Sequence, residues 1–252
     1  DELGLEVPTT VDEWHEVLTA FKEKKGAEAP LCFDWTNFKD SNPIAFAFKV
    51  GTANGTQFIL DDEGKVAFAP AQEGYKEYLM TLNQWYEEGL IDRDIATLNG
   101  DQVTAKMTSD KAGASVGWAA SRMQLFMTSA QQTNPEYTLV ATPTPTTEKG
   151  ATPEYGYVEN QFPDVAAAIT SSCKNVELAA KFLDYGYSEA GHNLFNFGIE
   201  GVSYEMKDGK AEYTDVVTNN PDGWPLAQSL AKYIRANYNG PFIQDLNYLE
   251  QY

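Results

Sequence analysis

The sequence predicts an α/β fold in which a mixed sheet is flanked by helices. Short apolar segments alternate with amphipathic segments along the chain, and this order is typical of strands followed by helices that cover a sheet. Helix-capping residues precede several amphipathic segments and glycines follow them, which indicates defined helix starts and ends. Of the 252 residues, 42% are hydrophobic and 13% are aromatic, which is enough to form a buried core.

The first predicted helix begins after Thr10 and ends at Gly26. Thr10 and Glu13 have the spacing of a capping box, in which each side chain accepts from the other residue's backbone amide. Three lysines precede Gly26, where cations stabilise the carbonyl end of a helix. The apolar residues at helical spacing are Trp14, Val17, Leu18 and Phe21.

A short strand and a hairpin are predicted next. Residues 31–33 form an apolar strand that leads into an aromatic loop at 34–38. The apolar run at 44–50 is interpreted as buried helix. An acidic, glycine-containing turn connects residues 57–60 to 66–69, which favours a hairpin.

In the middle of the chain, apolar segments continue to alternate with amphipathic segments. A helix is predicted for residues 72–88, and Gly89 ends it. The elements expected after it are a helix at 101–109, a buried strand at 112–118, a helix at 119–132, a strand at 137–141 and an exposed Thr- and Pro-rich loop at 142–153.

Two capped helices characterise the last third of the chain. Asn175 can cap the first and Ser188 the second, and Gly198 with Gly201 supplies the permissive backbone that ends the second. The apolar stripe of the first helix comprises Leu178, Phe182 and Leu183. The flanking elements are a continuous apolar strand at 164–171, a hairpin that turns at 208–210 and a helix at 224–237.

Charge and cysteine content exclude several kinds of partner. The formal net charge is −19, and no basic cluster could follow a phosphate backbone, so nucleic acid is excluded and anionic ligands are disfavoured. Cys32 and Cys173 lie far apart in apolar contexts without a CxxC motif, which argues against a zinc site and leaves their pairing open. The acidic turn at 61–64 lacks the ligand spacing of a calcium loop. We therefore expect no metal and no cofactor.

Catalytic groups are scarce. His15 and His192 lie in predicted amphipathic helices beside charged residues, where a solvated imidazole is expected. The sequence contains no nucleophile elbow, phosphate-binding glycine loop or HExxH motif. A pair of carboxylates like that of glycosidases stays open, although adjacent acids at 61–62 and 87–88 are explained by a turn and a helix end. We expect no catalytic residue.

Aromatic residues at strand exits are the better candidates for function. Sugars stack their apolar faces on aromatic rings while their hydroxyl groups need polar partners. In open α/β sheets, ligands bind outside the carboxyl ends of strands, where the sequence places Trp35 and Trp118. The expected ligand-binding residues are Asp34, Trp35, Asn37, Phe38, Trp118 and Tyr157.

Five sequence motifs carry a resemblance to a known family. They are VPTTVDEW at 7–14, WYEEGLID at 85–92, NVELAAKFLDY at 175–185, SEAG at 188–191 and FGIEGVSY at 197–204. In this order the chain resembles the family 1 extracellular solute-binding proteins of bacterial ABC importers, which are maltose-binding-protein-like. The resemblance implies a periplasmic-binding-protein-like type II lobe, and it implies that Trp118 is a stacking tryptophan at the end of its strand.

The resemblance also implies a function and a location. Such proteins capture a carbohydrate, here an oligosaccharide, in a cleft between two lobes that close on it, and deliver it to ABC permease subunits without catalysis. They are extracellular, either lipid-anchored at the cell surface in the full-length protein or periplasmic. The alternatives are a carbohydrate-active enzyme domain and a surface adhesion module.

The chain is expected to be a C-terminal-lobe fragment of a longer protein. It begins with neither a signal peptide nor a methionine. Residues 1–163 would form the second ligand-binding lobe, and residues 164–252 would supply a crossover strand, helices and a hairpin that reach the hinge and the first lobe. Because the helices at 175–197 would lack that lobe, we hypothesise self-association through their apolar stripe.

Overall fold

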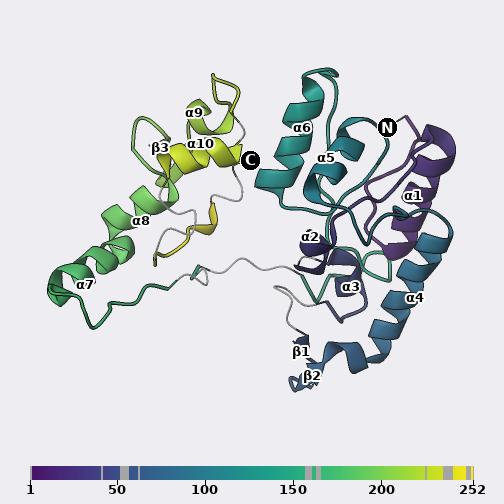
Figure 1. Cartoon of the computed structure of the whole chain (residues 1–252), viewed down its shortest axis with the longest axis horizontal. Helices are drawn as coiled ribbons and strands as arrows, with labels where there is room; N and C mark the ends of the chain where they lie inside the picture. Colours follow the sequence, from purple (N-terminus) through teal and green to yellow (C-terminus); the bar gives the residue numbers. More distant parts are fainter. Residues whose placement is uncertain are drawn as a thin grey trace. The chain divides into compact units, whose positions relative to one another are not determined.

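The chain folds into two compact units in the computed structural model, residues 1–157 and 158–252 (Figure 1). The structure describes residues 2–40, 42–51, 57–61, 63–156, 161–162, 166–224, 226–234, 241–247 and 251. The break between the units lies six residues before the predicted lobe boundary at 163, and the assignment of lobes stays a prediction. In the described part of the chain, no helix is long and apolar enough to cross a membrane.

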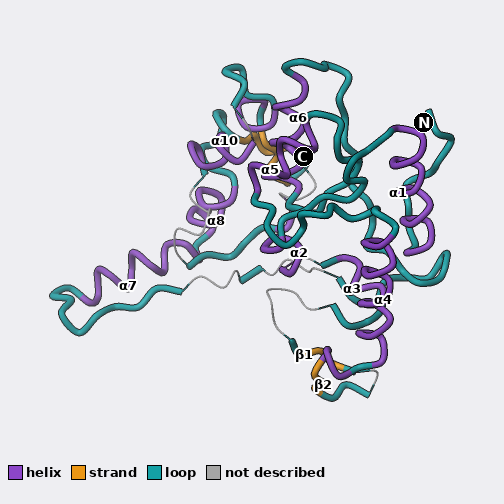
Figure 2. Tube along the Cα trace, turned by 45° about the vertical axis from the view of Figure 1, so that its right-hand side comes forward, coloured by secondary structure: helices purple, strands orange, loops and turns teal. Residues whose placement is uncertain are grey.

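The first unit is mainly helical (Figure 2). Its helices are α1 (Val11–Lys25), α2 (Trp35–Asp40), α3 (Pro43–Ala47), α4 (Glu73–Glu87), α5 (Gly100–Thr108) and α6 (Gln124–Gln131), with a 3₁₀ turn η2 (Ala69–Ala71) and a π-helical stretch η3 (Ala119–Met123). Its regular strands are β1 (Phe58–Leu60) and β2 (Val66–Phe68). All of the helices predicted for this unit are present, and α2 is additional.

Helix α1 begins and ends close to where the sequence predicts. The amide of Glu13 donates to Thr10 Oγ1 at 3.1 Å, and Gly26 adopts a left-handed conformation at φ 68°. The Glu13 carboxylate accepts from the amide and hydroxyl of Thr9, both at 2.8 Å, instead of the Thr10 amide expected of a capping box. The start of α1 is thus stabilised by hydrogen bonds between Glu13 and Thr9, the residue before Thr10.

Parallel pairing in this unit is limited to isolated bridges. Leu31 pairs with Ile91 on one side and with Ala114 on the other, and both bridges are parallel. The predicted strand at 112–118 is therefore reduced to a single bridge at Ala114, because the chain beyond it turns into the π-helical stretch. The predicted strand at 137–141 is irregular and has no ladder partner among the described residues, and this prediction was wrong.

The predicted exposed loop at 142–153 is mostly exposed, with one exception. Thr146 is buried and pairs with Thr10 in a parallel bridge, and its amide donates to the carbonyl of Thr9 at 3.0 Å. This contact fastens the loop to the start of α1.

The main core lies between α1, α4 and the extended segment at 31–33. Helices α1 and α4 lie side by side in both views (Figures 1 and 2), and His15 Nε2 lies 2.5 Å from Glu88 Oε2 at their ends. Trp85, which the sequence analysis did not place in the core, is almost fully buried there. A second cluster packs α5 and α6 around Cys32, and its largest members are Leu98, Met107 and Phe126.

The β1–β2 hairpin extends from the start of α4 (Figure 1). Its strands are antiparallel, with Phe58 opposite Phe68 and Leu60 opposite Val66. Asp61 Oδ1 accepts from the amides of Glu63 and Lys65, at 3.0 and 2.8 Å, and so shapes the turn. The Asp61 carboxylate therefore stabilises the turn of the hairpin.

The second unit contains two successive helices, a hairpin and two shorter helices. The elements are α7 (Val176–Asp184), η4 (Tyr185–Tyr187), α8 (Glu189–Asn196), β3 (Tyr204–Lys207), β4 (Lys210–Tyr213), α9 (Asp215–Thr218) and α10 (Leu226–Tyr233). Asn175 Oδ1 accepts from Leu178 N at 3.0 Å, and Ser188 Oγ accepts from Gly191 N at 3.1 Å. Both predicted caps are confirmed.

The predicted strand at 164–171 is not formed in the part that the structure describes. Residues 166–171 are exposed and lack a strand partner among the described residues. An apolar run becomes a strand only when a neighbouring strand accepts its backbone hydrogen bonds. Helix α7, which follows, contains no buried residue.

Candidate functional site

The segment at 34–38 is a helix start where the sequence predicted a loop. The amide of Phe38 donates to the carbonyl of Asp34 at 3.1 Å, which closes the first turn of α2. The ring of Phe38 stacks on Phe33, with centroids 3.9 Å apart and planes at 11°. This stacking lies between residues five positions apart and fixes the helical turn.

The helical turn places the two aromatic residues of this segment in different environments, one buried and one exposed. Phe38 is fully buried, whereas Trp35 has 55% of its surface exposed. The Trp35 ring lies 6.0 Å from the Phe38 ring, centroid to centroid. Trp35 is therefore the exposed ring of the two, whereas Phe38 belongs to the core.

Trp118 stands at the start of the π-helical stretch η3. Its carbonyl accepts from the amides of Arg122 at 2.8 Å and Met123 at 3.3 Å. The residue is 36% exposed, so core side chains do not enclose it. Short π-helical insertions frequently occur at functional sites.

The two tryptophans follow neighbouring segments of the chain. Leu31 and Ala114 pair in parallel, so the chain leaves the two paired segments on the same side, at their carboxyl-terminal edge. One segment leads to Asp34 and Trp35, and the other leads to Trp118. Exposed indole rings are of the kind that stack on the apolar faces of a sugar, and the binding role of the two tryptophans stays a prediction.

Arg122 is a residue of this edge that the sequence analysis missed. Its Nη2 lies 3.3 Å from Asp34 Oδ2, and its Nη1 donates to the carbonyl of Gly100 at 3.0 Å. Asp34 itself is 8% exposed, so the ion pair is partly withdrawn from water. The one available signal was the position of Arg122 four residues after Trp118, which is one helical turn.

Two predicted site residues are not described. Tyr157 lies outside the described residues, and so does the side chain of Asn37, whose backbone belongs to α2. Tyr155, two residues before Tyr157, donates from its hydroxyl group to the carbonyl of Leu60 at 2.6 Å, which attaches this segment to β1. The roles of Asn37 and Tyr157 therefore stay predictions.

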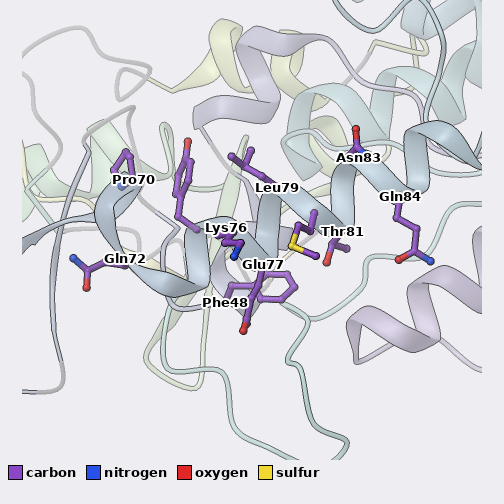
Figure 3. Close-up of a pocket in the computed structure, with 11 residues that line it drawn as sticks. Phe48, Pro70, Gln72, Lys76, Glu77, Leu79, Thr81, Asn83 and Gln84 are labelled. Atoms are coloured by element: carbon purple, nitrogen blue, oxygen red, sulfur yellow. The ribbon is translucent and has the colours of Figure 1, made fainter.

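A separate groove of about 780 Å³ runs along α4 (Figure 3). Lys76, Leu79 and Asn83 come from successive turns of the helix, and Phe48 lies beside them. None of the predicted site residues whose side chains the structure describes lines it. The shared concavity that the sequence predicts for Trp35 and Trp118 is a different feature and stays a prediction.

Cys32 is fully buried in the core cluster of α5 and α6. Burial, with a further contribution from the nearby Asp92 carboxylate, raises the pKa of the thiol to about 12. Asp92 Oδ2 also accepts from Lys106 Nζ at 2.5 Å. Both cysteines are free thiols. Among the described residues, no group of His, Cys, Asp or Glu side chains could hold a metal ion.

Comparison with protein families is decisive for the class of the chain. Residues 1–193 match the family model described as bacterial extracellular solute-binding protein. The chain belongs to this family. Membership agrees with the motifs at both ends of the matched range and locates the protein outside the cytoplasm, at the cell surface or in the periplasm.

Two curated relatives are similar over most of the chain. The fructooligosaccharide ABC transporter substrate-binding protein FusA of Streptococcus pneumoniae serotype 4 is 28% identical over 207 residues, which cover 79% of this chain and 37% of FusA. Lipoprotein LipO of Bacillus subtilis strain 168 is 27% identical over 233 residues, which cover 86% of this chain and 44% of LipO. This solute-binding chain therefore spans less than half the length of either relative.

Solved structures agree with the fold class. The crystal structure of alginate-binding protein AlgQ2 without calcium ion matches with a TM-score of 0.68 and 30% identity, over 99% of this chain and 51% of AlgQ2. FusA of S. pneumoniae as an EF-hand mutant in complex with fructo-nystose matches with a TM-score of 0.63 and 23% identity, over 98% of this chain and 50% of that chain. The fold is α/β, of the type II periplasmic-binding-protein-like class.

Proposed function

We propose that the protein containing this chain captures an oligosaccharide for an ABC importer, without catalysis. The observation that carries the proposal is the parallel pairing of Leu31 with Ala114, which brings the exits toward Trp35 and Trp118 to one edge. Trp35 and Trp118 are both exposed, and the segments that carry them are joined by the ion pair of Asp34 and Arg122. Asn37 and Tyr157 complete the proposed site, and Phe38, which the sequence also placed in it, is fully buried and packs against Phe33 instead of reaching a ligand.

Relatives guide the choice of substrate class. FusA is named for fructooligosaccharides and AlgQ2 for alginate. The net charge of −19 opposes the approach of a polyanion such as alginate. We therefore propose a neutral oligosaccharide, held between two lobes that close on it.

The proposed partners are the permease subunits of the importer. LipO is named a lipoprotein, and we propose lipid anchoring at the cell surface for the full-length protein as well. We also propose that the apolar face of α7 makes copies of the isolated chain associate, since Leu178 is 62% and Phe182 70% exposed.

A ligand panel tests the capture function. Neutral oligosaccharides and alginate fragments are titrated into the complete natural protein in a calorimeter, and Trp118→Leu and Trp35→Leu are measured alongside. We expect binding of a neutral oligosaccharide that either substitution weakens about tenfold, since stacking of a sugar on an indole ring contributes on the order of 1 kcal/mol or more. The control is Trp224→Leu, whose ring lies under Lys232 in the second unit and should not affect affinity.

Two other outcomes would replace the proposal. Turnover of a glycoside that disappears on substitution of one carboxylate would indicate an enzyme. Binding to a protein surface that depends on Trp35 and Trp118, with no sugar bound, would indicate an adhesion module.

A further inference from the structure

Arg122 contacts three separate segments of the first unit. Its backbone amide donates to the carbonyl of Trp118 at 2.8 Å, within the π-helical stretch. Its guanidinium reaches Gly100 O at the start of α5, at 3.0 Å, and Asp34 Oδ2 just before α2, at 3.3 Å. One side chain therefore joins the turn of Trp118 to the residue that precedes Trp35.

Two glycines leave space for this side chain. A Cβ atom on Gly117 would lie 2.7 Å from Arg122 Cβ, and one on Gly100 would overlap the guanidinium. Neither glycine has a positive φ. A side chain at Gly117 would therefore displace the stem of Arg122, and one at Gly100 would displace its guanidinium.

The chemistry of the contact requires arginine. The side chains of Arg122 and Asp34 are 23% and 11% exposed, so each charge depends on the other for compensation. The planar guanidinium can donate to Asp34 and to the Gly100 carbonyl at the same time with fixed geometry. A lysine ammonium is a point charge on a flexible stem and would hold both acceptors less rigidly.

We propose that Arg122 is the positioning residue of this edge, which holds the turn of Trp118 in place relative to the start of α2. A ring that is already fixed loses less conformational freedom when a ligand stacks on it, so positioning increases affinity. The effect on ligand binding rests on the proposed function. The effect on the Trp118 ring itself does not.

The first test observes the ring without a ligand. The complete natural protein is labelled with 5-fluorotryptophan, and the fluorine resonance of Trp118 is identified by its loss in Trp118→Phe. We expect Arg122→Met to shift or broaden this resonance and Arg122→Lys to do so less. The control is Arg93→Met, because Arg93 lies over the Tyr86 ring at 4.7 Å and donates to Glu87 O at the end of α4. An unchanged Trp118 resonance in folded Arg122→Met overturns the proposal.

Gly117→Ala provides a second variant if Arg122→Met does not fold. It displaces the stem of Arg122 while retaining both charges of the ion pair. We expect the same perturbation of the Trp118 resonance. A resonance identical to that of the unsubstituted protein contradicts the positioning role.

The second test measures affinity. Kestose is titrated into the complete protein, and we expect about tenfold weaker binding for Arg122→Met, partial recovery for Arg122→Lys and no change for Arg93→Met. Unchanged affinity in Arg122→Met, where Trp118→Leu weakens binding, overturns the proposal. If kestose and the rest of the panel do not bind even the unsubstituted protein, the capture function fails, and the fluorine spectrum still decides the positioning role.

Discussion

At the scale of single residues, burial explains the chemistry of Cys32. The thiol is fully enclosed beside Asp92, and its pKa is raised to about 12. At pH 8 only about one thiol in ten thousand would then be ionised, and the ionised form is the one that reacts. Enclosure also blocks reagents. Cys173 is only half-buried, so reagents can reach its thiol.

We therefore predict that the two thiols react at very different rates. In native protein at pH 8, Ellman's reagent should label Cys173 rapidly and leave Cys32 unlabelled until denaturant is added. Cys173→Ser should show no fast phase. A fast phase that persists in native Cys173→Ser would contradict the burial of Cys32.

Glu13 is the residue that links stability to pH most clearly. Hydrogen bonds from Lys149 and then from Thr9 lower the pKa of its carboxyl group from 4.5 to about 2. A pKa that is lower in the folded state means that the unfolded chain takes up the proton first as pH falls. The stabilisation is thus complete above about pH 5 and is lost between about pH 4.5 and pH 2.

The expected consequence concerns Glu13→Gln. This variant should have a lower melting temperature than the unsubstituted protein near neutral pH, and the difference should diminish as pH falls toward about 2. Thermal unfolding followed by circular dichroism at several pH values measures it. Glu23→Gln, at an exposed position on the same helix, is the control. A difference that stays constant with pH would refute the linkage.

At the scale of elements, α7 carries an apolar face that none of the described residues of the second unit buries. The helix has no buried residue, and it extends away from the hairpin of its own unit in both views (Figures 1 and 2). An isolated helix of nine residues is marginal in water. Its cap at Asn175 and an ion pair between Glu177 and Lys181 at 2.7 Å support it locally.

We predict that the exposed face drives association of the 252-residue chain. Sedimentation velocity over a concentration series should show a mass that rises with concentration, and the double variant Leu178→Glu with Phe182→Glu should remain monomeric. Glu177→Gln alters a polar position of the same helix and should associate like the unsubstituted chain. A monomer at high concentration in the unsubstituted chain would exclude association through α7.

Helices and hairpins could be predicted from the sequence because their signals are local. The caps at Asn175 and Ser188 act over three residues, and the turn at 208–210 connects adjacent strands. The strands predicted at 137–141 and 164–171 were wrong where the structure describes them, because a strand needs partners far along the chain and the local sequence does not show whether those partners are present. Helix α2 was missed because the stacking of Phe38 on Phe33 outweighs the local preference for a loop.

In the candidate site, too, local features could be predicted from the sequence and long-range contacts could not. Trp35 and Trp118 could be found because each follows an apolar run that resembles a strand. The contribution of Arg122 could not, because its partners Asp34 and Gly100 lie 88 and 22 residues away in sequence. A lone arginine in a helical segment gives no indication of contacts at that distance.

At the scale of the whole molecule, the length of the chain limits what it can bind. It spans 37% of FusA and 44% of LipO. Sites for small ligands typically enclose most of the ligand surface, and one exposed face leaves hydroxyl groups in water and stacks on one side of the ring only. If Trp35 and Trp118, which are both exposed, bind a sugar as proposed, they offer one face of this kind.

We predict that the 252-residue chain binds neutral oligosaccharides at least about a hundredfold more weakly than the complete natural protein does. The free energy of binding that remains after the cost of immobilising the ligand falls steeply when half of the contact surface is removed. Calorimetry on both proteins with the same oligosaccharide measures the ratio, and a cooperative thermal transition of the chain shows that weak binding does not result from unfolding. Micromolar or tighter binding by the chain alone would mean that its single face is sufficient, and the two-walled cleft would then be unnecessary for capture.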